Sequence, residues 1–211
     1  MSSEPIPSPR ATRTRAALIG AGFELLVERP IDAIPIDDFV AKAGVAKGSF
    51  FNHFADKQDF AEAIANEVRL EVESLVTRTN AGIADPVERI AGGMCVAASF
   101  ALAQPKRTAV LLRSQGSSTA LAHPLNRGLV ADIEAAAAQG LIRPEAASSG
   151  ALYWLGLCQI LMVNLLERRS CADDARQRVG DMIILGLTGL GVALQEATAL
   201  AARASHRIGQ G

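Results

Sequence analysis

Two short helical patterns joined by a glycine, at residues 36–57, constrain this chain more than any other feature. Apolar residues recur at helical spacing in the first pattern, at Ile36, Phe39, Val40 and Ala43. Gly44 follows at once, where a helix end favours a residue that adopts a left-handed conformation without a Cβ clash. Residues 47–54 form the second pattern, with Phe50 and Phe54 on its inward face. This arrangement predicts a helix-turn-helix, whose second helix can enter the major groove of DNA.

The outward side chains of the second pattern suit contact with duplex DNA. Lys47 can reach base edges or phosphate, and Gly48 lets the backbone approach the duplex closely. Hydrogen bonds to phosphate oxygens are offered by Ser49, Asn52 and His53. Asp56 is expected to cap the next helix, and Lys57 adds a cation beside its free backbone amides, which predicts an anion site.

At these residues the chain resembles the DNA-binding domain of the TetR family of bacterial transcriptional regulators. The family pattern runs Ala-Gly-Val-Ser-Lys-Gly-Thr, an aliphatic residue or Phe, Tyr-x-His-Phe, and a Lys a few residues later. This chain has Ala43-Gly44-Val45-Ala46-Lys47-Gly48-Ser49-Phe50-Phe51-Asn52-His53-Phe54 and then Lys57. The resemblance covers roughly residues 10–60. It implies base contacts by Lys47, Gly48 and Phe51, and phosphate contacts by Ser49, Asn52, His53 and Lys57.

Three residues depart from the family pattern. Ala46 replaces the Ser that caps the groove helix, a loss of about 0.5–2 kcal/mol where nothing else caps it. Phe51 replaces Tyr, which keeps ring contact with DNA and loses the hydroxyl. Pro35 stands where a Ser or Thr caps the preceding helix, and proline starts a helix without touching phosphate. Each departure weakens positioning on the DNA backbone, and none removes the groove helix.

Composition and charge favour an all-α fold with local rather than general basicity. The 211 residues are rich in Ala and Leu, and only 4% are aromatic. The net charge of −1 excludes a protein that coats nucleic acid, so positive charge must be local. It is expected at Arg10, Arg13, Arg15, Lys42, Lys47 and Lys57.

The cysteines and apolar runs indicate a cytoplasmic protein. Cys95, Cys158 and Cys171 are widely spaced with no CxxC, which is typical of reduced thiols; a redox switch is the less favoured alternative. The N-terminus has Pro and Ser where a signal peptide needs an apolar core. The apolar run 182–194 is shorter than the ~20 residues that a membrane span needs, so no membrane segment is expected.

We expect two helical domains. Residues 1–56 would form a DNA-binding helix-turn-helix head of three helices, preceded by a disordered arm at 1–9, and residues 57–211 a larger helical body for ligand binding and dimerisation. Helices are predicted at 10–28, 36–43, 47–54, 57–79, 86–104, 106–114, 123–139, 145–169 and 173–203. The clearest signals are Asp85-Pro86, which starts a helix, and Gln139-Gly140, which ends one.

The helices predicted at 145–169 and 173–203 are apolar on more than one face. One face would meet the chain's own core and another a partner subunit, with Gly186, Gly189 and Gly191 allowing close approach. Interface residues are expected at Leu155, Met162, Leu166, Ile183, Leu187 and Leu190. Burial of both helices inside one monomer is the alternative. The resemblance favours a homodimer paired through the last two long helices, and such a pair would read a palindromic operator.

A small-molecule inducer is implied by the resemblance, because many relatives bind one in the body. Residues 80–170 would form a mostly apolar cavity with few polar anchors. Its candidate residues are Met94, Phe100, Leu111, Arg113, Tyr153, Trp154, Leu157 and Met162. Trp154 is the strongest, because it would form a flat stacking wall beside Tyr153. Core packing or solvent exposure is the alternative for each of these residues.

No catalytic, cofactor or metal site is expected. His53, His123 and His206 are far apart and match no metal-binding spacing. Gly20-Ala21-Gly22 begins a partial dinucleotide fingerprint, but the third glycine and a preceding strand are missing.

The sequence therefore predicts a homodimeric transcriptional regulator, most simply a repressor, that a small, mostly apolar ligand releases from its operator. The resemblance implies that the ligand changes the separation of the heads, a coupling typically worth ~1–3 kcal/mol. Two alternatives stay open. One is a helical ligand-binding or scaffold protein without operator binding, favoured by Ala46, Pro35 and the weak basic charge. The other is a helical-bundle enzyme.

Overall fold

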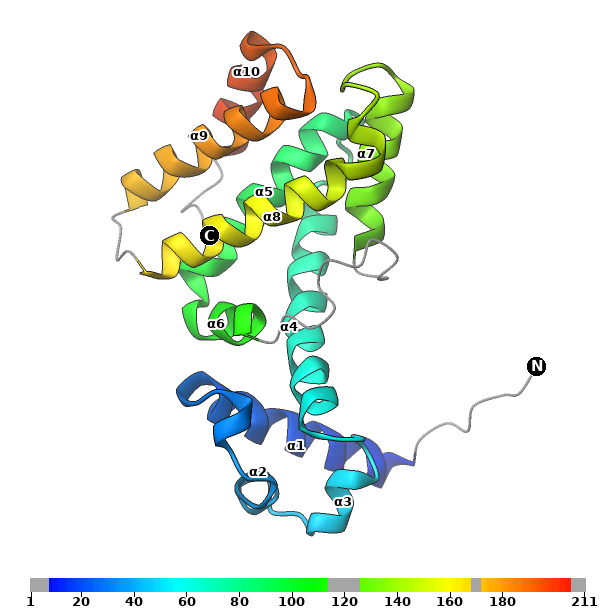
Figure 1. The fold of residues 1–211 in the computed structure, drawn as a ribbon, viewed down its shortest axis with the longest axis vertical. Helices are drawn as coiled ribbons and strands as arrows, with labels where there is room; N and C mark the ends of the chain where they lie inside the picture. The colour runs from blue at the N-terminus through cyan, green and yellow to red at the C-terminus, as the bar shows by residue number, and fades with distance from the viewer. Residues whose placement is uncertain (1–7, 114–125, 168–171, 206–211) are drawn as a thin grey trace, which may run out of the picture. The chain divides into compact units, whose positions relative to one another are not determined.

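The computed structural model describes residues 8–113, 126–167 and 172–205, and all regular structure within them is helical (Figure 1). The predicted all-α fold is confirmed. In chain order the helices are α1 Pro9–Glu28, η1 Ile31–Ala33, α2 Ile36–Ala43, α3 Lys47–Phe51, α4 Lys57–Thr79, α5 Pro86–Ala103, α6 Pro105–Arg113, α7 Arg127–Ala138, α8 Ala146–Glu167, α9 Ala172–Leu190 and α10 Leu194–Ser205. The predictions for most of the N-terminal arm, for a helix start near residue 123, and for Cys171, His123 and His206 lie outside the described residues.

The chain divides into two compact units. The first unit takes its described residues from 1–68 and 109–116, and the second from 69–108 and 117–211. The first unit therefore contains α1, η1, α2 and α3, together with the beginning of α4 and the end of α6.

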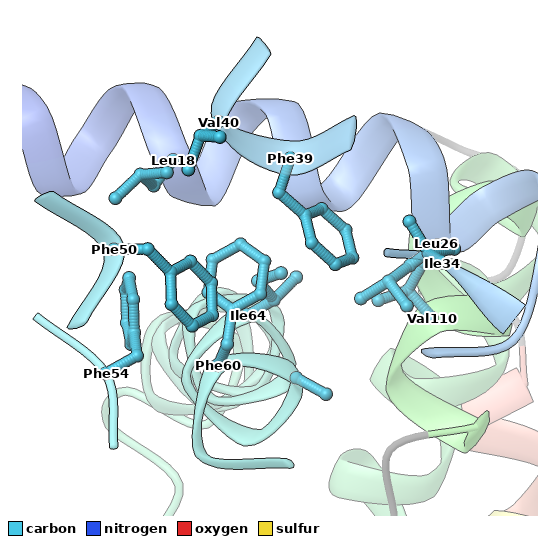
Figure 2. Packing of buried hydrophobic residues seen from close by; sticks show 11 residues of the cluster. Leu18, Leu26, Ile34, Phe39, Val40, Phe50, Phe54, Phe60, Ile64 and Val110 are labelled. Atoms are coloured by element: carbon cyan, nitrogen blue, oxygen red, sulfur yellow. The ribbon is translucent and has the colours of Figure 1, made fainter. Parts of the chain in front are cut away.

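Aromatic rings form the centre of the first unit's core (Figure 2). The Phe60 ring centroid lies 5.0 Å from that of Phe39, 5.1 Å from that of Phe50 and 4.7 Å from that of Phe54. These rings come from α2, α3, the turn after α3 and α4, so one cluster holds all of them together. Leu26, Ile34 and Val110 pack further along the same cluster. Burial of four phenylalanines is the main stabilisation that fixes the helix-turn-helix.

Helix starts follow the caps that the sequence indicates. The Asp85 carboxylate accepts from the Val87 amide at 2.8 Å, and proline occupies the first turn of α5. Before α4, the Asp56 carboxylate accepts from the amides of Gln58 and Asp59, both at 2.8 Å. Both predicted caps are confirmed. The first helix starts one residue earlier than predicted, at Pro9, because the Ser8 side chain caps it.

Glycines in the left-handed region end three helices. Gly44 (φ 66°) and Gly140 (φ 69°) end α2 and α7 as predicted. The single helix predicted over 173–203 is wrong, because Gly191 (φ 101°) ends α9 and the chain starts again as α10. The Val192 amide bonds back to the Leu187 carbonyl at 3.0 Å, and the Leu190 carbonyl accepts from the Arg143 amide at 2.8 Å. The apolar pattern runs through this break, which is why the sequence conceals it.

The second unit is built around α5, which packs against α7, α8, α9 and α10. Arg89 fixes its first turns: the guanidinium pairs with Asp132 of α7 at 2.6 Å and donates to the carbonyls of Ile83 and Ala84 at 2.8 Å. Helices α5 and α8 are long and apolar enough to cross a membrane by length and composition, a test that the core helices of a globular protein also pass.

Glycines let α8 and α9 approach closely, as predicted. A Cβ on Gly186 would lie 2.6 Å from the Trp154 ring, and one on Gly189 would overlap the Tyr153 hydroxyl. Both aromatic residues of α8 therefore lie against glycines of α9.

Replacing Glu73 of α4 by glutamine is expected to stabilise the protein at alkaline pH. Burial raises the pKa of Glu73 from 4.5 to about 7, and Arg69 opposes the rise only in part. The folded state therefore holds this proton more tightly than the unfolded state, so the group's contribution to the free energy of unfolding falls between about pH 4.5 and 7. Because solvent screens this half-buried group, we expect Glu73→Gln to raise that free energy by about 1–2 kcal/mol at pH 8. Urea unfolding at pH 5 and pH 8 checks this; an equal gain at both values would contradict it.

Candidate nucleic-acid interface

The turn between α2 and α3 is held by backbone bonds and by one buried ring. The Val45 amide donates to the Val40 carbonyl at 3.0 Å around the left-handed Gly44. Phe50, fully buried, fastens α3 to the core. The α-helix ends at Phe51, earlier than the predicted residue 54, and the chain turns there toward the Asp56 cap of α4. The observed α2–turn–α3 unit confirms the predicted helix-turn-helix.

The α3 surface carries most of the residues predicted to contact DNA. Exposed residues are Lys47, Gly48, Phe51 and Asn52, whereas Ser49 and His53 are half-buried. Phe51 keeps 54% of its surface exposed although it is a large apolar residue. A Cβ on Gly48 would meet no atom within 4 Å, so packing within the protein gives no reason for glycine there. Helix stability would favour almost any other residue, and the missing side chain leaves the start of α3 open to close approach.

The two helices begin without side-chain caps, as the sequence departures predicted. Neither Pro35 before α2 nor Ala46 before α3 supplies a capping hydrogen bond. Acidic residues in the first turn of α2, Asp37 and Asp38, offset this loss through the helix dipole.

Four cations among the described residues of the first unit are engaged in ion pairs. Lys47 Nζ lies 2.9 Å from Asp37 Oδ1, and Lys42 Nζ lies 2.7 Å from Glu24 Oε2. The Glu24 pairing raises the pKa of Lys42. Further pairs join Arg15 to Glu67 and Arg29 to Asp38. Of the cations predicted for this surface, Arg15, Lys42 and Lys47 are each compensated by a carboxylate.

Lys57 makes a different set of contacts from the predicted phosphate site. Its ammonium donates to the carbonyls of Ile31, Asp32 and Ile34 at 3.2–3.3 Å. The neighbouring amides that would share an anion are already bonded to the Asp56 carboxylate. In this conformation Lys57 fastens the start of α4 to the segment that leads into α2. The sequence gives no sign of this role, because the acceptors lie 23 to 26 residues away.

The structure places the candidate ligand residues in several environments. Met94, Phe100, Trp154 and Met162 are buried in the second unit, Leu157 is half-buried and Tyr153 is exposed. Leu111 and Arg113 belong to the first unit. Arg113 donates to the carbonyls of Leu26 and Val27 at the end of α1, and it lines a cavity of about 190 Å³ in that unit. Arg113 thus belongs to a different unit from the candidates of α5 and α8.

The candidate dimer residues also separate by burial. Met162, Ile183, Leu187 and Leu190 are buried within this one chain, and Leu155 and Leu166 are half-buried. The large apolar residues exposed on α8 and α9 are Leu152, Tyr153, Ile160 and Leu185. Leu152 and Ile160 are two helical turns apart on one face of α8, a spacing that the sequence displayed.

The Cys158 thiol is a weak acid in this fold. Burial, with a smaller effect of Cys95, raises the pKa of the Cys158 thiol to about 12, so it stays protonated at neutral pH. No group of three or more His, Cys, Asp or Glu side chains is placed to hold a metal ion among the residues that the structure describes.

Comparison with known proteins identifies the N-terminal segment. Residues 18–64 match the family model of bacterial regulatory proteins of the tetR family. The transcriptional regulator AcuR of Cereibacter sphaeroides is 37% identical over 60 residues, which cover 28% of this chain and 27% of AcuR. The transcriptional repressor DhaR of Mycobacterium sp. strain GP1 is 31% identical over 68 residues, which cover 32% of this chain and 34% of DhaR. The chain thus spans about a third or less of these relatives' length in its matches to them.

Solved structures share the fold over nearly the whole chain. RolR in complex with resorcinol matches with a TM-score of 0.71 and 22% identity, over 92% of this chain and 95% of that one. NalD, the secondary repressor of the MexAB-OprM multidrug efflux pump in Pseudomonas aeruginosa, matches with a TM-score of 0.64 and 20% identity, over 85% and 98%. Both resemblances extend through the second unit, so the architecture of an N-terminal helix-turn-helix with a larger helical body is confirmed.

Proposed function

Because this chain belongs to the TetR family of bacterial regulatory proteins, we propose that it regulates transcription by binding an operator through α3. The observation that carries the proposal is the exposed α3 surface, where Gly48 has no packing role and Phe51 is left uncovered. Lys47, Gly48 and Phe51 would face base edges, and Ser49, Asn52 and His53 would hold phosphates. Lys57 would support this surface from its carbonyl contacts, and it would reach phosphate only by leaving them.

The second unit would form the homodimer that places two α3 helices on a palindrome. Only 39% of an apolar 18-residue stretch of α8 is buried inside the chain. We therefore propose that the dimer interface is formed by apolar residues that are at least partly exposed in the single chain: Leu152, Leu155, Ile160, Leu166 and Leu185. Covering this surface would supply the hydrophobic stabilisation that dimers of this size need. Light scattering that gives twice the chain mass supports the dimer, and a single chain mass at micromolar concentration contradicts it.

Release by a small, mostly apolar ligand would complete the mechanism. RolR was solved in complex with the ligand resorcinol, so a protein of this fold can bind a small phenol. A ligand would lower operator affinity if it binds more tightly to a state whose two α3 helices do not match successive major grooves. The free-energy loss in operator binding can be no larger than the difference between the ligand's binding free energies for the two states. The cytoplasm is the compartment where such a protein meets DNA. The matched relatives are regulators, and we propose no enzymatic activity.

Replacing Lys47 by alanine is expected to weaken operator binding by about 1–3 kcal/mol, because Lys47 begins the helix that enters the groove. Footprinting on the DNA upstream of the protein's own gene supplies the operator, and titration in fixed salt compares the two proteins. Dimerisation should be unchanged.

A helical ligand-binding protein without operator binding is the alternative, which the paired lysines favour. Specific, salt-sensitive protection by the wild-type protein supports the regulator; protection of no fragment above random duplex supports the alternative.

A further inference from the structure

The lysine proposed to read the operator is already held by a carboxylate of the neighbouring helix. Lys47 Nζ and Asp37 Oδ1 are 2.9 Å apart, and their side chains are 58% and 68% exposed. Asp37 lies in the first turn of α2 and Lys47 begins α3, so both lie where the two helices start. A duplex that met Lys47 would therefore meet Asp37 as well.

Charge on this surface opposes general binding to DNA. Non-specific binding depends almost wholly on cations that neutralise phosphates. Here Lys47 is already in an ion pair with Asp37, and Lys42 is in one with Glu24. A phosphate that approached Lys47 would have to displace Asp37, and it would then stay near an uncompensated carboxylate. The carboxylate and the phosphate are both negative, so they repel each other. In a non-specific complex no base contact offsets this repulsion.

A specific complex would feel less of this repulsion. A lysine that bonds to the O6 and N7 atoms of guanine lies on a base edge, away from the phosphates. A carboxylate 2.9 Å away would then help to hold the lysine at that position, as it does in the free protein. Asp37 would thus penalise random duplex more than operator.

Building on the proposed function, we infer that Asp37 is a specificity-determining residue, which suppresses binding to random DNA by competing with phosphate for Lys47. Discrimination in this design comes from a repulsive element as well as from attractive contacts. The role differs from that of Asp38 next to it, whose carboxylate pairs with Arg29 at 3.1 Å.

The test replaces Asp37 by asparagine in the full chain. Two probes are used, a duplex with the footprinted sequence and a scrambled duplex of equal length, each titrated between about 50 and 200 mM KCl. We expect Asp37→Asn to bind the scrambled duplex about 5- to 10-fold more tightly and the operator less than about 3-fold more tightly. The salt slope for scrambled DNA should steepen by about 0.9, equivalent to one more neutralised phosphate.

Matched variants separate this role from general charge and from folding. Asp38→Asn removes one negative charge from the same helical turn but leaves the Asp37–Lys47 ion pair intact. It should therefore leave the ratio of the two affinities unchanged. In a Lys47→Ala background, Asp37→Asn should change the ratio less than it does in the wild type, because competition for the lysine is gone and only the repulsion of phosphate remains. Asp37→Ser also suits a first helical turn, and circular dichroism identifies whichever neutral variant is folded.

The outcomes are distinct. A wild-type protein that prefers no sequence would overturn the proposed function. A wild-type protein that prefers its operator, with Asp37→Asn leaving the affinity ratio unchanged or raising both affinities equally, would overturn only the inference about Asp37.

Discussion

Phe60→Ala is expected to lower the free energy of unfolding of the first unit by about 3–5 kcal/mol. The Phe60 ring is fully buried and contacts the rings of Phe39, Phe50 and Phe54. Truncation would leave a cavity at the point where α2, α3 and α4 meet, so the helix-turn-helix should lose its fixed shape. The only tryptophan, Trp154, lies in the second unit. Circular dichroism should therefore show an early partial loss of helix that Trp fluorescence does not follow.

Phe51→Ala is the matched control for Phe60→Ala. Phe51 is next to Phe50 in the sequence but 54% exposed, so its truncation should change the free energy of unfolding by no more than about 0.5 kcal/mol. It should instead weaken operator binding, because its ring belongs to the surface proposed to meet DNA. Equal destabilisation by the two variants would show that the core is not centred on Phe60.

Gly22→Ala is expected to destabilise the first unit by about 1–3 kcal/mol. A Cβ at this position would overlap the Phe60 ring and lie 2.5 Å from Ile64 Cδ1. Both neighbours are fully buried, so neither side chain has room to move aside. Thermal unfolding followed by circular dichroism measures the effect.

Gly20→Ala in the same helix should have the opposite sign. Gly20 is exposed, and a Cβ added there would meet no atom within 4 Å, so alanine should stabilise α1 by about 0.5–1 kcal/mol. Destabilisation by both changes would mean that helix α1 itself, and not its contact with α4, is sensitive at these glycines.

Local rules made most of the fold predictable from the sequence. The Asp56 and Asp85 caps and the Gly44 and Gly140 helix ends depend on a few neighbouring residues, and all four were confirmed. The end of α9 at Gly191 has the same local bond as the other two glycine ends, from the Val192 amide to the Leu187 carbonyl. It was not predicted because the apolar pattern continues past the glycine, which was assigned to close helix packing.

For the candidate site, the sequence predicted which side chains are buried and which are exposed wherever the helical period alone decides this. The period of α3 separates buried Phe50 from exposed Phe51, and the structure agrees. Pairing between helices was not readable, so the Asp37 partner of Lys47 was missed. On α9 the sequence showed apolar residues on several faces without showing which face turns inward: Ile183 and Leu187 are buried, whereas Leu185 is 64% exposed.

The three carbonyl bonds of Lys57 bear on any attempt to redirect the protein to a new DNA sequence. Several acceptors converge on one nitrogen there, which a compact ammonium can satisfy and a planar guanidinium cannot. Lys47, only ten positions earlier, has one surface partner and no such restriction. A library that randomises Lys47 and its exposed neighbours should therefore yield folded proteins with altered targets, whereas one that includes Lys57 would lose most members before selection begins.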